Sequence, residues 1–186
     1  YNINEELLSS CNSSWNDTFY DESKLENIKD ISKLKVAIKQ EFEYCDTFAI
    51  KDPRLAFLFP VYKKVLDELG IAIKIILPYR NPVEVASSLN KRNNMPLEEG
   101  MLLWAYHFLL AEKFSRGYDR VFVGFDELLQ NCEKIIGDIS NGLQIDFHEK
   151  YTKNKETINE FLEPNLKHHN ISIDNLSSNI PKIVKD

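Results

Sequence analysis

Two short segments of this sequence carry basic side chains at positions from which they could bind an anion. In one of them Arg80 precedes Asn81 and Pro82, and Ser88 follows the arginine by eight residues. Asparagine is a favoured N-cap and proline a favoured first residue, so the pattern predicts a helix that begins at Pro82. Helix N-termini with a nearby cation bind phosphate or sulfate, because unpaired N–H groups and the helix dipole both point at the anion. We therefore expect Arg80, in the turn before this helix, to contact an anion. In the alternative, Arg80 is a loop arginine and Ser88 an ordinary surface serine.

The other segment is Lys51-Asp-Pro-Arg54, which follows a short apolar run. Lys51 is a candidate cation for stabilising a developing negative charge, and Arg54 can pair bidentately with a phosphate or an acidic acceptor. Asp52 is the nearest carboxylate and a candidate general base. The alternative is that Asp52 bonds to Arg54 or to loop N–H groups and simply fixes the turn.

The elements that position these residues are predicted from hydrophobic patterning. Short apolar runs at 47–50, 72–77 and 120–124 have the length and composition of buried strands. Helical patterns cover 22–44, 61–69, 82–94, 96–116 and 132–143. Strands that alternate with helices predict an α/β domain with a parallel sheet, whose ligands bind beyond the carboxyl ends of the strands. We expect this domain to span 1–169, followed by a poorly ordered tail over 170–186.

Composition narrows the possible partners. The chain has 186 residues and a net charge of −6, which argues against a general nucleic-acid binder. Its three cysteines, Cys11, Cys45 and Cys132, have neither a disulfide framework nor metal-ligand spacing, so we expect reduced thiols and a cytoplasmic protein. No apolar run approaches the roughly 20 residues of a membrane helix, although the sequence leaves membrane association undetermined.

Several segments, taken in order, resemble bacterial sulfotransferase-like proteins. The matching segments are Lys51 to Arg54, Tyr79 to Ser88, Leu103 to Tyr106, Val121 to Leu129 and Leu162 to His168. The resemblance covers most of residues 3 to 169. It implies a three-layer P-loop-NTPase-like domain in which a central parallel sheet is flanked by helices.

The resemblance also implies an activity. Members of the family move a sulfuryl group from 3′-phosphoadenosine 5′-phosphosulfate to an acceptor, here a hydroxyl that family association predicts to belong to a saccharide. No metal is implied. The 3′-phosphate of the co-substrate is assigned to Arg80, Ser88 and Arg92, and catalysis to Lys51, Asp52 and Arg54.

One departure from the family pattern leaves other hypotheses open. The family has a glycine-rich loop that grips the 5′-phosphosulfate, but the first of the six glycines here is Gly70. We therefore expect a fragment that begins after that loop, with an unfilled sheet position whose edge favours self-association. The alternatives are a kinase-like phosphoryl transferase, in which Asp126 could bind the metal, and a non-catalytic domain that binds a nucleotide or a partner.

Overall fold

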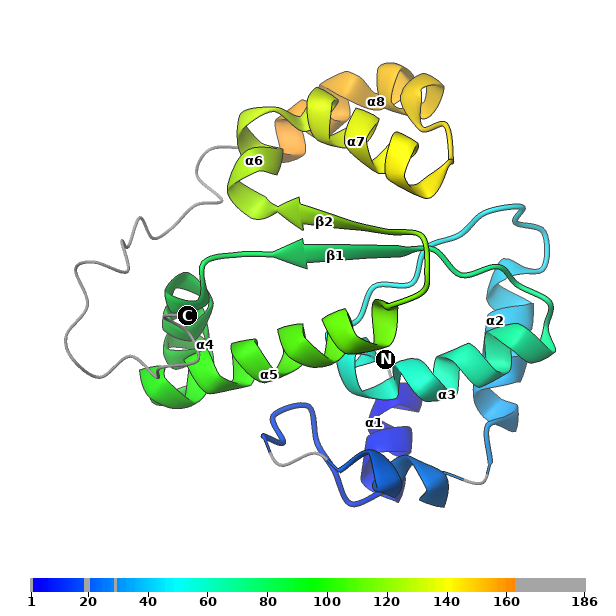
Figure 1. Cartoon of the computed structure of the whole chain (residues 1–186), viewed down its shortest axis with the longest axis vertical. Coiled ribbons are helices and arrows are strands. Elements are labelled where there is room, and N and C mark those ends of the chain that lie inside the picture. Colours follow the sequence, from blue (N-terminus) through cyan, green and yellow to red (C-terminus); the bar gives the residue numbers. More distant parts are fainter. Residues whose placement is uncertain (1, 19–20, 29, 163–186) are drawn as a thin grey trace. The chain divides into compact units, whose positions relative to one another are not determined.

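The structure, a computed structural model, describes residues 2–18, 21–28 and 30–162. It is a helix-dominated α/β protein with a small parallel sheet flanked by helices (Figure 1). The chain divides into unit 1, residues 1–73 and 106–116, and unit 2, residues 74–105 and 117–186. Most of the last matching segment and the predicted tail over 170–186 lie outside the described residues. Within the described ranges, no helix is long and apolar enough to cross a membrane.

Unit 1 is helical in its described part. It contains α1 (Asn2–Ser10), the 3-10 helix η1 (Glu22–Asn27), α2 (Ser32–Phe42), α3 (Leu55–Glu68) and the second half of α5 (Leu97–Ser115). Its core is formed by apolar side chains of these helices, among which Leu8, Phe57, Leu58 and Val65 are fully buried. Contacts of α3 with α1, α2 and η1 make α3 the central helix of this unit.

The helix predicted over 22–44 is wrong as one continuous helix. Ile28 leaves helical backbone angles at the end of η1, with φ −77° and ψ 88°. Asp30 Oδ1 then accepts a hydrogen bond from Ser32 N at 2.9 Å, at the start of α2. The apolar stripe predicted the right buried face but not this break, because aspartate and serine compete locally for backbone hydrogen bonds.

Helix α3 continues through a proline and ends before a glycine. The helix begins at Leu55 rather than at the predicted Val61, and it continues through Pro60. Full burial of Phe57 and Leu58 offsets the hydrogen bond that Pro60 cannot make. The predicted stop at Gly70 is confirmed, since this residue has φ 68° and Ile71 N bonds back to Leu66 O at 2.9 Å.

The strand predicted at 47–50 is also wrong. This segment forms no ladder in the described part of the chain and is irregular. Phe48 and Ile50 pack against the core of unit 1, and the Phe48 ring stacks on Phe42 at 4.0 Å between centroids. The apolar side chains explain the sequence pattern, but a strand also needs a neighbouring strand to bond with.

Unit 2 contains the sheet. Its elements are β1 (Ile75–Tyr79), α4 (Pro82–Asn93), the first half of α5, β2 (Arg120–Gly124), α6 (Phe125–Gln130), α7 (Cys132–Leu143) and α8 (His148–Phe161). The parallel pairing predicted for the second and third strands is confirmed, with a register from Ile75 opposite Arg120 to Tyr79 opposite Gly124. The strand predicted at 72–77, β1, begins later than predicted. Its first residue is Ile75, whose N bonds to Asp119 O.

Helix α7 packs on β2, and α6 and α8 pack on α7, as Figure 1 shows. Val123 on the strand and Ile135, Ile139 and Leu143 on the helix form a small buried cluster. Gly142 allows this close approach, because a Cβ atom there would lie 2.3 Å from a methyl carbon of Val121. The cluster fixes the carboxyl end of β2, and through the ladder that of β1.

The edge of β1 remote from β2 has no strand partner in the described residues. Alternate residues of a strand bond to opposite sides, so the bond from Ile75 N to Asp119 O turns Ile76 and Pro78 toward this edge. Pro78 cannot donate a hydrogen bond, which makes the edge a poorer template for another strand. Self-association through this edge stays a prediction.

Candidate functional site

The junction between β1 and α4 positions Arg80. Strand β1 ends at Tyr79, and Asn81 caps α4 by accepting a hydrogen bond from Val83 N to its Oδ1 at 2.9 Å. Pro82 is the first helical residue, so the strand–turn–helix prediction is confirmed here. Arg80 is thereby placed at the positive end of the helix dipole.

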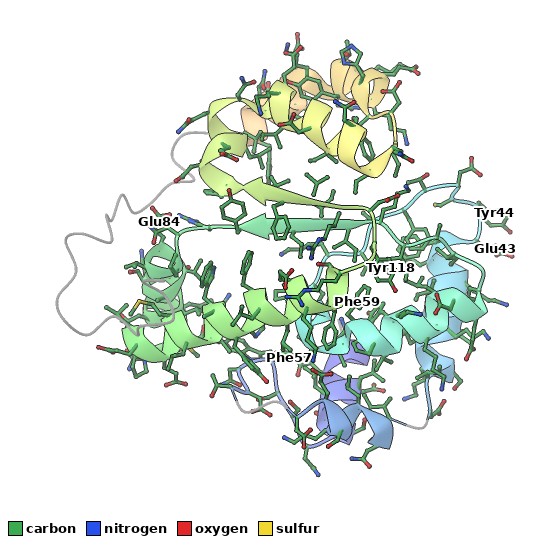
Figure 2. All side chains as sticks on the ribbon, viewed as in Figure 1. Glu43, Tyr44, Phe57, Phe59, Glu84 and Tyr118 are labelled. Atoms are coloured by element: carbon green, nitrogen blue, oxygen red, sulfur yellow. The ribbon has the colours of Figure 1, made fainter. Side chains whose placement is uncertain are left out.

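The Arg80 guanidinium is held on one edge and one face. Its Nε donates to Glu84 Oε2 at 2.7 Å, and its Cζ lies 4.6 Å from the centre of the Phe125 ring. Glu84, labelled in Figure 2, is only 2% exposed in the first turn of α4. The Arg80 side chain is 27% exposed to solvent. Its two terminal nitrogens make no hydrogen bond within the described residues. Those nitrogens form the planar pair of donors that matches a phosphate or sulfate.

Ser88 and Arg92 continue along α4 from this point. Glu84, Ser88 and Arg92 follow one another at four-residue spacing, which places them on one face of the helix. Each step advances about 6 Å along the axis. Ser88 is exposed, and Arg92 is exposed with its Nε donating to Asn93 Oδ1 at 2.6 Å. The face therefore carries a hydroxyl and a second cation beyond Arg80.

Arg54, in unit 1, has a different environment. Asp52 Oδ1 accepts hydrogen bonds from Arg54 N at 2.9 Å and from Arg54 Nε at 2.8 Å, and Asp52 Oδ2 accepts one from Nη2 at 2.5 Å. The remaining terminal nitrogen of Arg54 donates to Glu5 on α1. Only 4% of Arg54 is exposed. Two carboxylates therefore occupy both terminal nitrogens and the Nε of this arginine.

The hydrogen bonds also decide the charge of Asp52. Burial alone raises the pKa of its carboxyl, but hydrogen bonds from the side chain and backbone of Arg54 and from Asn4 outweigh burial and lower the pKa to about 2. Hydrogen bonding to Asp52 raises the pKa of Arg54. A carboxylate with so low a pKa is a weak general base at neutral pH. These contacts are the ones expected if Asp52 fixes the turn.

Two further polar side chains lie beside this turn in the core of unit 1. Tyr62 Oη donates to Asn4 Oδ1 at 2.7 Å, next to the carboxylates. His107 Nε2 lies 2.9 Å from Trp15 O, and its ring packs edge-on to Phe57 (labelled in Figure 2) at 4.4 Å. Burial lowers the pKa of His107, so the ring is neutral at pH 7. Lys51, by contrast, is exposed at the start of the turn.

The predicted residues therefore form two groups. Lys51, Asp52 and Arg54 lie together in unit 1, and Arg80, Ser88 and Arg92 lie together in unit 2. Asp126, the candidate metal ligand, follows β2 in unit 2, and no group of three His, Cys, Asp or Glu side chains in the described ranges is arranged to hold a metal ion.

Sequence reasoning named Asp52 as an alternative partner of Arg54, but it missed Glu5, Glu84 and Phe125. Glu84 had a visible signal, because opposite charges four residues apart at a helix start commonly pair. Glu5 and Phe125 had none, since they lie 49 and 45 residues from the arginines they contact.

No family model, no curated protein and no solved structure matches the chain. What the two sites do must therefore be inferred from their own geometry and from the sequence motifs.

Proposed function

We propose that the chain is part of a sulfotransferase that uses 3′-phosphoadenosine 5′-phosphosulfate, and that Arg80, Ser88 and Arg92 bind the 3′-phosphate. The observation that carries the proposal is the Arg80 guanidinium, which is fixed at a helix N-terminus and directs two terminal nitrogens to no partner within the described residues. The order of the sulfotransferase-like motifs supports the same assignment. A complete three-layer P-loop-like fold, a saccharide hydroxyl as acceptor and a cytoplasmic location belong to this proposal. The three cysteines form no disulfide, which is compatible with that location.

The reaction assigns distinct roles in unit 1. In sulfuryl transfer the acceptor oxygen bonds to sulfur, the bond from sulfur to the bridging phosphate oxygen breaks, and the acceptor proton leaves to a base. Lys51 is the exposed cation available to stabilise charge on the leaving phosphate. Asp52 and Arg54 act in this proposal mainly by fixing the turn that carries Lys51, because their polar groups are bonded to each other and to Glu5.

Calorimetric titration with two nucleotides tests the assignment of Arg80. A charge-assisted hydrogen bond contributes about 1.5–3 kcal/mol, so Arg80→Ala should weaken adenosine 3′,5′-bisphosphate binding by roughly ten- to a hundredfold. Ser88→Ala removes a neutral bond of about 1 kcal/mol and should cost about fivefold. Affinity for adenosine 5′-phosphate, which lacks the 3′-phosphate, should hardly change in either variant.

Arg116→Ala is the matched control for this titration. Arg116 also pairs with a glutamate four residues away, through Nη2 and Glu112 Oε2 at 2.7 Å, but it lies in unit 1 and is 69% exposed. Its loss should leave both affinities unchanged. Equal losses for both nucleotides in Arg80→Ala would contradict the assignment, and so would a wild-type chain that does not bind the bisphosphate.

A second function has support from two observations. The sequence holds no glycine-rich phosphate loop, and the Asp52 carboxylate has a pKa of about 2, so neither a 5′-phosphosulfate grip nor a base is evident near Lys51. These features favour a domain that binds the nucleotide without turnover. Transfer of labelled sulfate from 3′-phosphoadenosine 5′-phosphosulfate to a saccharide mixture separates the two functions. Only a sulfotransferase forms labelled product, and its Lys51→Ala variant should form less product while it still binds the bisphosphate.

A further inference from the structure

We propose that Glu84 and Phe125 are positioning residues that hold Arg80 in its anion-binding orientation before any ligand arrives. The inference rests on the proposed function for the identity of the ligand, the 3′-phosphate, but the fixed orientation of Arg80 is a property of the unliganded chain. Neither residue reaches the ligand in this proposal. Both act through the guanidinium.

Glu84 fixes the inner edge of the guanidinium. Its Oε2 accepts the Nε–H of Arg80 at 2.7 Å, and the Glu84 side chain is only 3% exposed. A carboxylate buried to that extent needs a charged or hydrogen-bonding partner, so breaking this contact is unfavourable. The contact uses the Nε–H and leaves the outer edge, with both terminal nitrogens, directed away from Glu84.

Phe125 fixes one face of the same group. Tyr79 pairs with Gly124 at the end of the ladder, so Arg80 and Phe125 each follow a residue of that last pair. The Arg80 Cζ atom consequently lies over the Phe125 ring, 4.6 Å from its centre. Attraction between the cation and the ring restrains rotation of the guanidinium out of this plane.

Preorganisation of this kind changes affinity without adding a contact to the ligand. An arginine side chain has several rotatable bonds, and a mobile one loses that freedom when it binds. An arginine already held by Glu84 and Phe125 has less freedom to lose, so its terminal nitrogens bind an anion more tightly.

Unit 2 contains a matched control for the aromatic contact. Arg120 lies with its Cζ 5.3 Å from the centre of the Phe122 ring, a similar pair on the same sheet. Phe122 precedes Phe125 by three residues, and 41% of it is exposed. Phe122→Leu therefore removes an aromatic partner of an arginine without touching Arg80.

The first experiment measures the order of the Arg80 side chain without ligand, by ¹⁵N relaxation of its Nε–H group. We expect Arg80 to be ordered in the wild type, with an order parameter near the value of about 0.85 found for rigid groups. Phe125→Leu and Glu84→Ala should lower it toward or below about 0.6, the range of flexible groups. Three variants should leave Arg80 ordered. Phe125→Tyr keeps an aromatic ring and Glu84→Gln keeps an acceptor oxygen, while Phe122→Leu changes a residue that does not contact Arg80. A mobile Arg80 in the wild type, or an Arg80 that stays ordered in Phe125→Leu, overturns the proposal.

The second experiment measures whether the effect passes through Arg80. Phe125→Leu should weaken adenosine 3′,5′-bisphosphate binding about threefold to tenfold and should have no further effect in the Arg80→Ala background. An equal loss in both backgrounds means that Phe125 only supports the fold, which overturns the proposal. If the wild type does not bind the bisphosphate, the proposed function fails, and the relaxation measurement still decides whether Glu84 and Phe125 position Arg80.

Discussion

Arg54 and Arg80 each pair with a nearby carboxylate, yet their surroundings differ. Arg54 is buried in unit 1, with Nε and both terminal nitrogens bonded to Asp52 and Glu5. Arg80 in unit 2 uses its Nε for Glu84 and its face for Phe125, and its terminal nitrogens have no hydrogen-bond partner in the described residues. An arginine whose hydrogen-bond donors are all used within the fold is structural, whereas one with unused donors is a candidate for binding a ligand. The presence of an arginine in a motif does not distinguish the two cases.

The two arginines should therefore respond differently to mutation. Loss of Arg54 should mainly reduce stability, and loss of Arg80 should mainly reduce anion affinity.

Arg54→Ala should have the largest effect on stability. The substitution leaves the largely buried Asp52 carboxylate and Glu5 without their cation, and breaking a buried ion pair typically costs about 3–5 kcal/mol. Urea unfolding followed by circular dichroism measures this loss. Arg116→Ala, which breaks an exposed arginine–glutamate pair, should have a much smaller effect, because solvent screens the interaction. Similar losses in the two variants would show that the buried network contributes little.

The pH dependence of unfolding should report Asp52. Its pKa of about 2 in the folded chain is below the ordinary value of about 3.9, so its contribution to stability is present above about pH 4 and is lost as the pH falls toward 2. A pKa lowered from about 3.9 to about 2 corresponds to about 2–3 kcal/mol. Urea unfolding at several pH values should therefore show a loss in the wild type that is smaller by this amount in Asp52→Asn. Parallel pH profiles for the two proteins would contradict the low pKa.

Arg80→Ala should destabilise the chain less than Arg54→Ala does. The partner left behind is Glu84, a buried carboxylate at a helix N-terminus, and an unsatisfied buried polar group costs about 1–3 kcal/mol. The double variant Arg80→Ala/Glu84→Gln removes that unpaired charge and should recover part of the loss. Thermal unfolding of both variants tests this, and no recovery in the double variant would mean that the cost does not arise at Glu84.

Lys51→Ala should have the smallest effect on stability. Lys51 is exposed, and surface substitutions outside specific contacts usually change stability by less than about 0.5 kcal/mol. Urea unfolding beside the wild type measures the difference. A loss above about 1 kcal/mol would assign Lys51 a structural role like that of Arg54 and weaken its proposed role as a catalytic cation.

Local signals in the sequence determined many element boundaries. Asn81 and Pro82 predicted the start of α4, and Gly70 predicted the end of α3. The predicted helix over 132–143 coincides with α7, and the apolar runs at 72–77 and 120–124 contribute the two parallel strands. These predictions succeed because caps, left-handed glycine and hydrophobic periodicity act within a few neighbouring residues.

Only the tertiary structure decided what the apolar run at 47–50 and the two arginines do. The run has the composition of a strand, but its side chains pack into unit 1 and no described strand bonds to it. Likewise, Arg54 and Arg80 look similar in sequence, and each has a carboxylate partner nearby in the chain, Asp52 and Glu84. Their remaining contacts, with Glu5 and Phe125, come from distant segments. A strand needs a partner, and an arginine binds a ligand only through donors that the fold has not already used, so neither outcome is encoded in the local sequence.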